Sequence, residues 1–153
     1  MRSIQEIEAF VARFYPNARI LLTPFGYPVT FSALAQNTSQ TANINIAANA
    51  DFLFLAVRHR AQIGAAQTIS SVTAPFVRLL LTDSGTNEQY TNGAVDILNY
   101  STEGGYDHQL PYPRLVSGRS ALTLVASNYA PTAETYTTLD VFLEGCLIRQ
   151  QSN

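Results

Sequence analysis

The feature that most constrains the fold of this chain is a two-residue alternation of apolar and polar side chains from residue 38 onward. It is clearest in residues 120–129 (SALTLVASNY) and 135–149 (TYTTLDVFLEGCLIR). A period of two is the repeat of a β-strand, because successive side chains point to opposite faces. About six to eight such segments with turn signals between them predict a sandwich or barrel. The sequence has no β–α–β alternation, so a parallel sheet is disfavoured.

One long predicted strand covers residues 51–63 (DFLFLAVRHRAQI). One face is predicted to carry Phe52, Phe54 and Ala56, and the opposite face Leu53, Leu55 and Val57. The second half becomes amphipathic, with Arg58 and Arg60 on one side and His59 on the other.

One helix is predicted at the N-terminus, over residues 3–14. Ser3 and Glu6 form the S-x-x-E capping box that satisfies unpaired backbone N–H groups at a helix start, and Pro16 ends the helix. Apolar residues recur at helical spacing on one face, namely Ile4, Ile7, Phe10, Val11 and Phe14. This face can pack on the chain's own sandwich or dock on a neighbouring protein, and the first arrangement is the more common.

Residues 19–36 are interrupted by Pro24, Gly26 and Pro28. Proline lacks a backbone N–H and is found at sheet edges and turns, not in central strands. We therefore predict two short extended pieces that act as an arm or edge segment.

The length of 153 residues is that of one ordinary domain. We divide it into an N-terminal helix with an extended arm, residues 1–36, and a β-sandwich domain, residues 37–150. No apolar run reaches membrane-spanning length, so no membrane contact is expected. The first fifteen residues contain two glutamates where a signal peptide would be apolar, so export by that route is not predicted.

The chain carries few charges. Charged residues make up 13% of the sequence, all nine basic residues are arginine, and the net charge is -2. Ser, Thr, Asn, Gln and Tyr must therefore cover much of the surface. Uncharged polar groups lose less on leaving water than ions do, which favours large and permanent protein contacts. Since no basic run is present, nucleic-acid binding is not expected.

One segment is similar to a catalytic signature. Residues 79–86 (LLLTDSGT) match the D-[ST]-G-[TA] pattern of aspartic proteases, in which a homodimer of short chains builds a carboxylate pair. The alternative, which we favour, is a strand that ends in a turn. In that turn Asp83 accepts backbone N–H bonds and Gly85 supplies a positive φ.

The two histidines and the single cysteine have no metal-ligand spacing. His59 is predicted to be a packed strand residue, and His108 a loop residue without a nucleophile elbow nearby. Cys146 lies in an apolar stretch and is predicted to be a small buried hydrophobe. We therefore expect no enzyme, no catalytic residue, no cofactor and no metal site.

Three groups of side chains are candidates for partner binding. Phe10 and Phe14 lie on the apolar face of the helix. Arg58 and Arg60 share one strand face, with Arg78 in the following strand. These arginines either pair with acids inside the domain, which we favour, or reach a partner chain.

The third group consists of Tyr100, Tyr106 and Tyr112, around a Gly- and Pro-rich loop at residues 101–113. Loop tips of sandwiches commonly carry binding sites. Tyrosine there can anchor a protein interface or stack on a sugar ring. A carbohydrate-binding β-sandwich module is therefore an alternative function.

The C-terminal half also carries a spaced set of residues. They are Leu110, Pro111, Pro113, Ser120, Leu122, Leu124, Asn128, Leu143 and Gly145. Over residues 75–149 the chain resembles small virion proteins of tailed bacteriophages. In those proteins a strand, an L-P-x-P turn, a strand that ends in Asn and a final strand with Leu and Gly build a jelly-roll-like sandwich.

Together with the strand pattern, this resemblance leads us to expect an antiparallel β-sandwich of jelly-roll type with one N-terminal helix. It implies a capsid decoration (cement) protein on the virion surface, made in the host cytoplasm and bound to the major capsid protein or other virion proteins. A homotrimer is also implied, because it fits the local threefold axes of a capsid. A head–tail, tail accessory or connector protein is the alternative within the same class.

Overall fold

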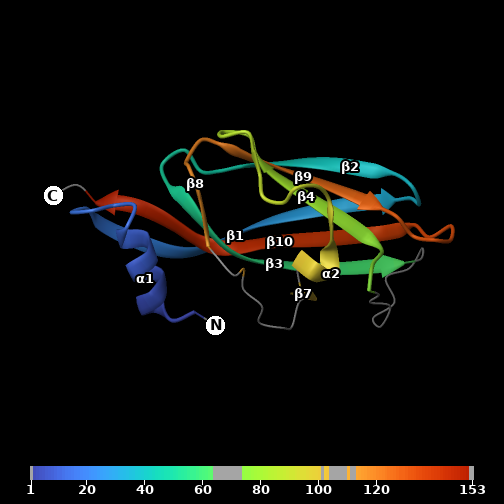
Figure 1. Cartoon of the computed structure of the whole chain (residues 1–153), viewed down its shortest axis with the longest axis horizontal. Coiled ribbons are helices and arrows are strands. Elements are labelled where there is room, and N and C mark those ends of the chain that lie inside the picture. The colour runs from blue at the N-terminus through green and yellow to red at the C-terminus, as the bar shows by residue number, and fades with distance from the viewer. Residues whose placement is uncertain (1, 64–73, 101, 104–109, 111–112, 152–153) are drawn as a thin grey trace.

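A computed structural model describes residues 2–63, 74–100, 102–103, 110 and 113–151. In these residues two mainly antiparallel sheets lie face to face, and a helix lies beside one end of the sandwich (Figure 1). The predicted mainly β, antiparallel sandwich with an N-terminal helix is confirmed.

The elements in chain order are α1 (Ile4–Ala12), β1 (Arg19–Leu34), β2 (Ser39–Asn45), β3 (Asp51–Ile63), β4 (Val77–Asp83), β5 (Glu88–Gln89), β6 (Val95–Asp96), α2 (Ile97–Tyr100), β7 (Thr102–Glu103), β8 (Arg114–Val116), β9 (Ala121–Asn128) and β10 (Tyr136–Gln151). The first sheet has the order β1-β10-β3, with β7 and β8 both paired to β3. The second sheet has the order β2-β9-β4, with β5 and β6 both paired to β4.

The strand pairs are nested along the chain. β1 pairs with β10, β2 with β9, β3 with β8 and β4 with β5, so each pair encloses the next, as in one long hairpin that closes at residues 84–87. Further pairs, β3 with β10 and β4 with β9, join the arms of this hairpin into two sheets. The first and last strands therefore lie side by side along their whole length (Figure 1).

The core lies between the sheets and takes alternate residues from each long strand. In β9 every second side chain from Leu122 to Asn128 is buried, and in β10 Leu139, Val141 and Leu143 are buried. The alternation predicted for both segments is confirmed. Each fully buried leucine or valine contributes about 1.5–3 kcal/mol through removal of apolar surface from water.

Strand β3 changes phase at a β-bulge, which the sequence pattern did not predict. Its pairing with β10 shifts between Glu144 and Gly145, and Leu55 is left without a Cα partner on β10. The core receives Phe52, Phe54, Val57 and Ala61, whereas Leu53 and Leu55 pack in a second cluster with α1. The face predicted for Val57 is therefore wrong, because one extra residue turns every following side chain to the opposite face.

Helix α1 packs on the outer face of the first sheet. Its capping box forms as predicted, with Ser3 Oγ accepting from the Glu6 backbone N–H and Glu6 accepting from the Ser3 N–H. The helix ends at Ala12, two residues earlier than predicted. Val11 is buried with Leu53, Leu55 and Ile148. Of the two arrangements considered for the apolar helix face, the structure therefore contains packing on the chain's own sandwich.

A polar contact holds the end of this helix segment to the sandwich. The Tyr15 hydroxyl donates a hydrogen bond to Asp51 Oδ2, at the start of β3. The other carboxylate oxygen, Oδ1, accepts from the Gly118 N–H at 2.7 Å. One carboxylate thus joins the segment that follows α1, strand β3 and the turn before β9.

Residues 19–34 form one continuous strand, not the two predicted pieces. Strand β1 runs through Pro24 and Pro28 and pairs with β10 from end to end. The strand lies at the edge of the first sheet, where proline is tolerated because its missing N–H points away from the neighbouring strand. Phe31 and Leu34 are buried in the core shared with residues 37–150.

The turn after β4 takes the form that we favoured. Asp83 is buried, and its Oδ1 accepts from the Gly85 N–H at 2.8 Å. The positive φ is found at Asn87 (57°) and not at Gly85, so that part of the prediction is wrong. Gly85 instead allows a close approach, because a Cβ there would lie 2.8 Å from Ser120 Cβ.

Candidate protein-docking site

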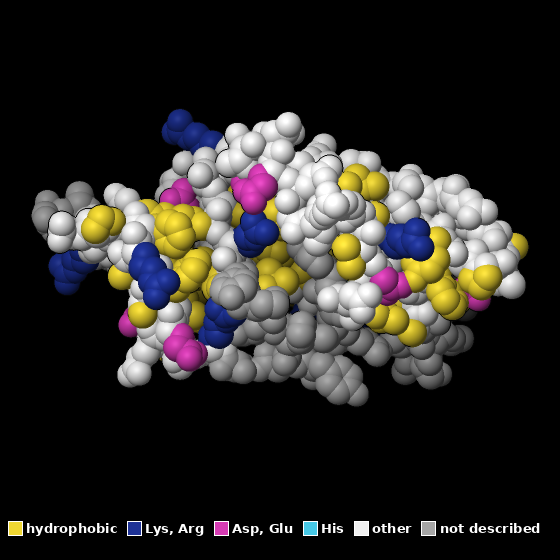
Figure 2. Space-filling model, viewed as in Figure 1, with side chains coloured by type: hydrophobic (Ala, Val, Ile, Leu, Met, Phe, Trp, Pro, Cys, Tyr) yellow, Lys and Arg dark blue, Asp and Glu magenta, His cyan; other side chains and the backbone are white. Residues whose placement is uncertain are grey.

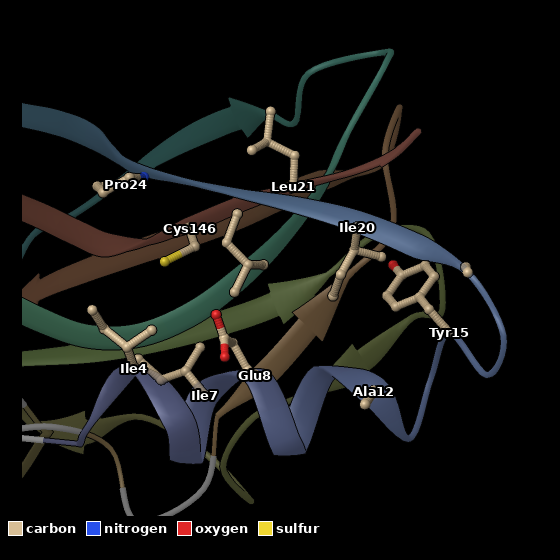
Figure 3. A pocket seen from close by; sticks show the side chains of 11 residues that line it. Ile4, Ile7, Glu8, Ala12, Tyr15, Ile20, Leu21, Pro24 and Cys146 are labelled. Carbon is tan, nitrogen blue, oxygen red and sulfur yellow. The ribbon is translucent and has the colours of Figure 1, made fainter. Parts of the chain in front are cut away.

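An apolar hollow with a volume of about 650 Å³ lies between α1 and the N-terminal half of β1. We call it the α1–β1 groove and define it by Ile4, Ile7, Glu8, Ile20, Leu21 and Cys146. In Figure 3, α1 forms one wall, β1 the other, and Cys146 lies on the neighbouring strand β10.

The groove exists because only part of α1 touches the sheet. Val11 is buried against β3 and β10, whereas Ile4, in the first turn, keeps 73% of its surface exposed. Leu21, on β1, is 47% exposed, but its side chain projects away from the helix, so its exposed surface lies beside the groove and not between its walls (Figure 3). An apolar hollow with an exposed isoleucine at its helix wall is typical of a surface that binds another protein or an apolar ligand.

The groove carries one negative charge among apolar walls. Glu8 rises from α1 toward β1 (Figure 3). Burial raises the pKa of the Cys146 thiol, and the negative charge of Glu144 raises it further. The thiol therefore stays protonated at neutral pH and contributes apolar surface, but Cys146 is only partly buried and not buried as predicted.

Phe10 and Phe14, two predicted partner-binding residues, lie next to the groove but do not line it. Phe10 is half-buried against the sheet cluster, and its ring centroid lies 5.2 Å from that of Phe14. Phe14 is exposed. The helix face thus contributes both to packing and to apolar surface at the same end of the molecule.

Arg58 and Arg60 lie on the outer face of the first sheet. Arg58 Nε lies 2.8 Å from Glu144 Oε2, which agrees with the favoured pairing inside the domain. Arg60 is exposed opposite Asp140 and borders a small hollow of about 210 Å³ that Phe142 also lines. Both arginines are on the face that α1 partly covers, but neither reaches the groove.

Arg78 does not join that pair, because β4 belongs to the second sheet and not to the strand beside β3. Its guanidinium carbon lies 4.4 Å from the ring centroid of Tyr129. The Tyr129 hydroxyl donates to Asp96, and the Phe76 ring meets the Tyr129 ring edge-on at 5.8 Å. Arg78 thus lies in the strand that follows β3 along the chain, as predicted, but that strand belongs to the other sheet.

The third group of predicted partner-binding residues, the loop tyrosines, lies largely outside the described residues. Tyr100 ends α2, but its side chain is not among the described parts, and Tyr106, Tyr112 and His108 lie outside the described residues. Carbohydrate binding through these tyrosines therefore stays a prediction. His59 is buried in its strand, as expected for a packed residue.

Several of the described residues that carry the resemblance to phage virion proteins are buried in the sandwich. Leu122, Leu124 and Leu143 are core residues, and Pro113 is buried. Asn128 is 2% exposed, and its side-chain amide hydrogen-bonds three backbone groups. These residues stabilise the interior of the sandwich, and none of them lines the α1–β1 groove.

The sequence pattern did not predict the exposure of Ile4 and Leu21 at this groove. It places Ile4 on an apolar helix face that either packs on the sandwich or docks on a neighbour, and Leu21 in an arm or edge segment. A signal for Leu21 exists, because Ile20, Leu21 and Leu22 are consecutive apolar residues in one strand. With a period of two, such a run cannot all face the same side, so at least one must project from the opposite face of the sheet.

No protein-family model matches this sequence, and a search of curated proteins finds no match.

Among the residues that the structure describes, no three His, Cys, Asp or Glu side chains gather as a metal site would require. No described helix has the length and apolar character needed to cross a membrane.

Proposed function

We propose that this chain is a structural virion protein without catalytic activity, a capsid decoration protein at the surface of a bacteriophage head. In this role it binds the major capsid protein or another virion protein through the α1–β1 groove. The observation that carries the proposal is the apolar groove itself, with Ile4 exposed on its helix wall.

The composition of the exterior supports this role. Figure 2 shows hydrophobic side chains gathered beside α1 and again where β4 begins and β9 ends, with few charged side chains between them. An uncharged polar surface costs less to desolvate than a charged one, and exposed apolar groups add favourable burial. Such a surface suits a protein that remains attached to its neighbours.

The strand order supports the jelly-roll part of the proposal. The chain alternates between the sheets from β1 to β4 and returns through β9 and β10, with nested pairs. A rolled hairpin of this kind is what a jelly roll requires, and the architecture is frequent in viral capsid domains. Fold by itself does not determine function, so the groove remains the main argument.

The groove also defines the chemistry of its partner. Its walls are apolar, so the partner segment presents apolar side chains. Glu8 adds one negative charge, which favours a partner with a basic group at that end of the segment. We assign this segment to the capsid protein that the chain decorates.

The test is co-sedimentation of the full chain with particles assembled from the major capsid protein of the same phage. We expect the chain to sediment with the particles and to raise the temperature at which they open. The Ile4→Asp variant places a charge on a wall residue that is 73% exposed, so its affinity should fall about tenfold or more.

Leu98→Asp is the matched control, because Leu98 is 54% exposed in α2 and outside the groove. It should bind as the unchanged chain does. The decoration role is rejected if the unchanged chain stays in the supernatant. The groove assignment is rejected if Ile4→Asp binds as well as the control.

A further inference from the structure

Each sheet ends in a strand with one edge that no described strand pairs, β1 in the first sheet and β2 in the second. An open edge presents a row of backbone N–H and C=O groups that can pair with another chain. Soluble proteins protect such edges with proline, charge or bulges. The two edges of this sandwich differ in that protection.

The β1 edge is protected. Pro24 and Pro28 are four residues apart, so both face the side away from β10 and remove two N–H donors from the open edge. Ser32 belongs to the same alternate set, and its carbonyl accepts from the Gln40 side chain at 2.8 Å. A strand from another molecule could therefore form only an incomplete set of backbone hydrogen bonds with this edge.

The hydrogen bonds between β2 and β9 show which backbone groups of β2 face the open edge. The Ile46 N–H donates to Ser120 O at 2.9 Å, and the Asn128 N–H donates to Thr38 O at 3.0 Å. Even-numbered residues of this segment therefore direct their backbone groups toward β9. The remaining set points its N–H and C=O groups to the open edge: Ser39, Thr41, Asn43 and Asn45.

This second edge lacks the usual protection. The segment SQTANIN, residues 39–45, contains no proline, glycine or charged residue. Its register with β9 runs without a shift, so no bulge twists the edge away. The four residues with outward backbone groups all have exposed side chains. A regular, uncharged and exposed edge of this length is suited to strand pairing.

We propose that β2 pairs antiparallel with β2 of a second copy of this chain, across a twofold axis near Ala42. The outward set is symmetric about that position, so the axis brings Thr41 opposite Asn43 and Ser39 opposite Asn45 of the other copy. Such pairing forms up to about eight hydrogen bonds. Because the segment carries no charge, no like charges meet at the contact.

A second copy fits this edge because the contact is self-complementary, as an isologous twofold interface requires. The pairing joins the second sheet of one copy to the second sheet of the other. It leaves α1 uncovered, because α1 lies on the outer face of the first sheet. The dimer would present two α1–β1 grooves. The contact is independent of what the groove binds, and it predicts a dimer where the resemblance to virion proteins implies a trimer.

The mass of the full chain in solution tests this proposal, measured by light scattering after size exclusion over a range of concentrations. The unchanged chain should approach twice its mass of 16.7 kDa. Thr41→Lys brings two positive charges to the axis and should raise the dissociation constant about tenfold or more. Thr30→Lys, on the protected β1 edge, is the matched control and should remain dimeric.

Amide hydrogen exchange gives a second readout that does not depend on a variant. The N–H groups of Thr41 and Asn43 should exchange more slowly as concentration rises, while that of Gly26 on the β1 edge should not change. A monomeric or trimeric mass, a dimeric Thr41→Lys, or exchange at Thr41 that ignores concentration overturns the proposal. Particle binding by the groove is measured separately, so failure of one proposal is distinguishable from failure of the other.

Discussion

The main-chain carbonyl of Leu53 lies where the side chain of residue 145 would begin: a Cβ added to Gly145 would be 1.9 Å from Leu53 O. The cause is the β-bulge in β3, which brings this carbonyl against β10. No flexible side chain can move to relieve the overlap, because the obstructing atom belongs to the backbone. A glycine in the last strand is therefore a requirement of the bulge.

Gly145→Ala should destabilise the protein by about 1–3 kcal/mol, since β3 or β10 must shift to admit a methyl group. The free energy of unfolding, measured by denaturant titration, checks this expectation. Gly26→Ala is the matched control. Its Cβ would meet the end of the Phe142 ring, which is exposed and can turn away. Equal losses for both variants would contradict the role given to the bulge.

Asn128→Asp should destabilise the fold by about 3 kcal/mol or more. The change keeps the acceptor for the Ala130 N–H but removes both amide donors, to Leu34 O at 3.0 Å and Glu134 O at 2.8 Å. It also places a carboxylate in a site that is 2% exposed. Asn43→Asp, in exposed β2, should change stability little, because its Oδ1 acceptor is retained. Thermal unfolding of the two variants provides the comparison.

The contact of Tyr15 with Asp51 predicts loosening of α1 at alkaline pH. Burial raises the pKa of Tyr15, and the hydrogen bond and charge of Asp51 raise it further. Because the folded-state pKa lies above the unfolded value, the stabilisation is complete below about pH 10 and is lost as the pH rises beyond it.

Amide exchange in α1 between pH 8 and pH 11, corrected for the intrinsic rate, measures this effect. Tyr15→Phe should remove the additional pH dependence. Burial also raises the pKa of Tyr136, so some alkaline sensitivity of the whole fold should remain in that variant. Identical pH profiles in both proteins would rule out a contribution from Tyr15.

Cys146 should react slowly with thiol reagents at pH 7. Burial and the charge of Glu144 raise its pKa, so the thiolate fraction is smaller than that of a free cysteine. The rate should increase with pH, and the increase should be centred above the pKa of a small-molecule thiol measured alongside. A segment bound in the α1–β1 groove should slow the reaction further. Fast modification at neutral pH would contradict this description of the groove.

Several parts of the fold were predictable because they depend on neighbours along the chain. Ser3 and Glu6 lie within one helical turn, so their capping box follows from spacing alone. The buried side chains of β9 follow from a strict period of two. The candidate site was less predictable. Ile4 has the spacing of a packed helix residue, yet it remains exposed because the first turn of α1 lies across the groove from β1.

The sequence by itself determined the antiparallel β class, the two-faced strands and the start of the helix. Their causes are local: side-chain alternation and capping act over a few residues. Only the tertiary structure decided that Val57 faces the core, that Pro24 and Pro28 lie in one continuous edge strand, and that the β2 edge is open. These outcomes depend on which distant strands pair and in which register, and a bulge of one residue reverses every face that follows it.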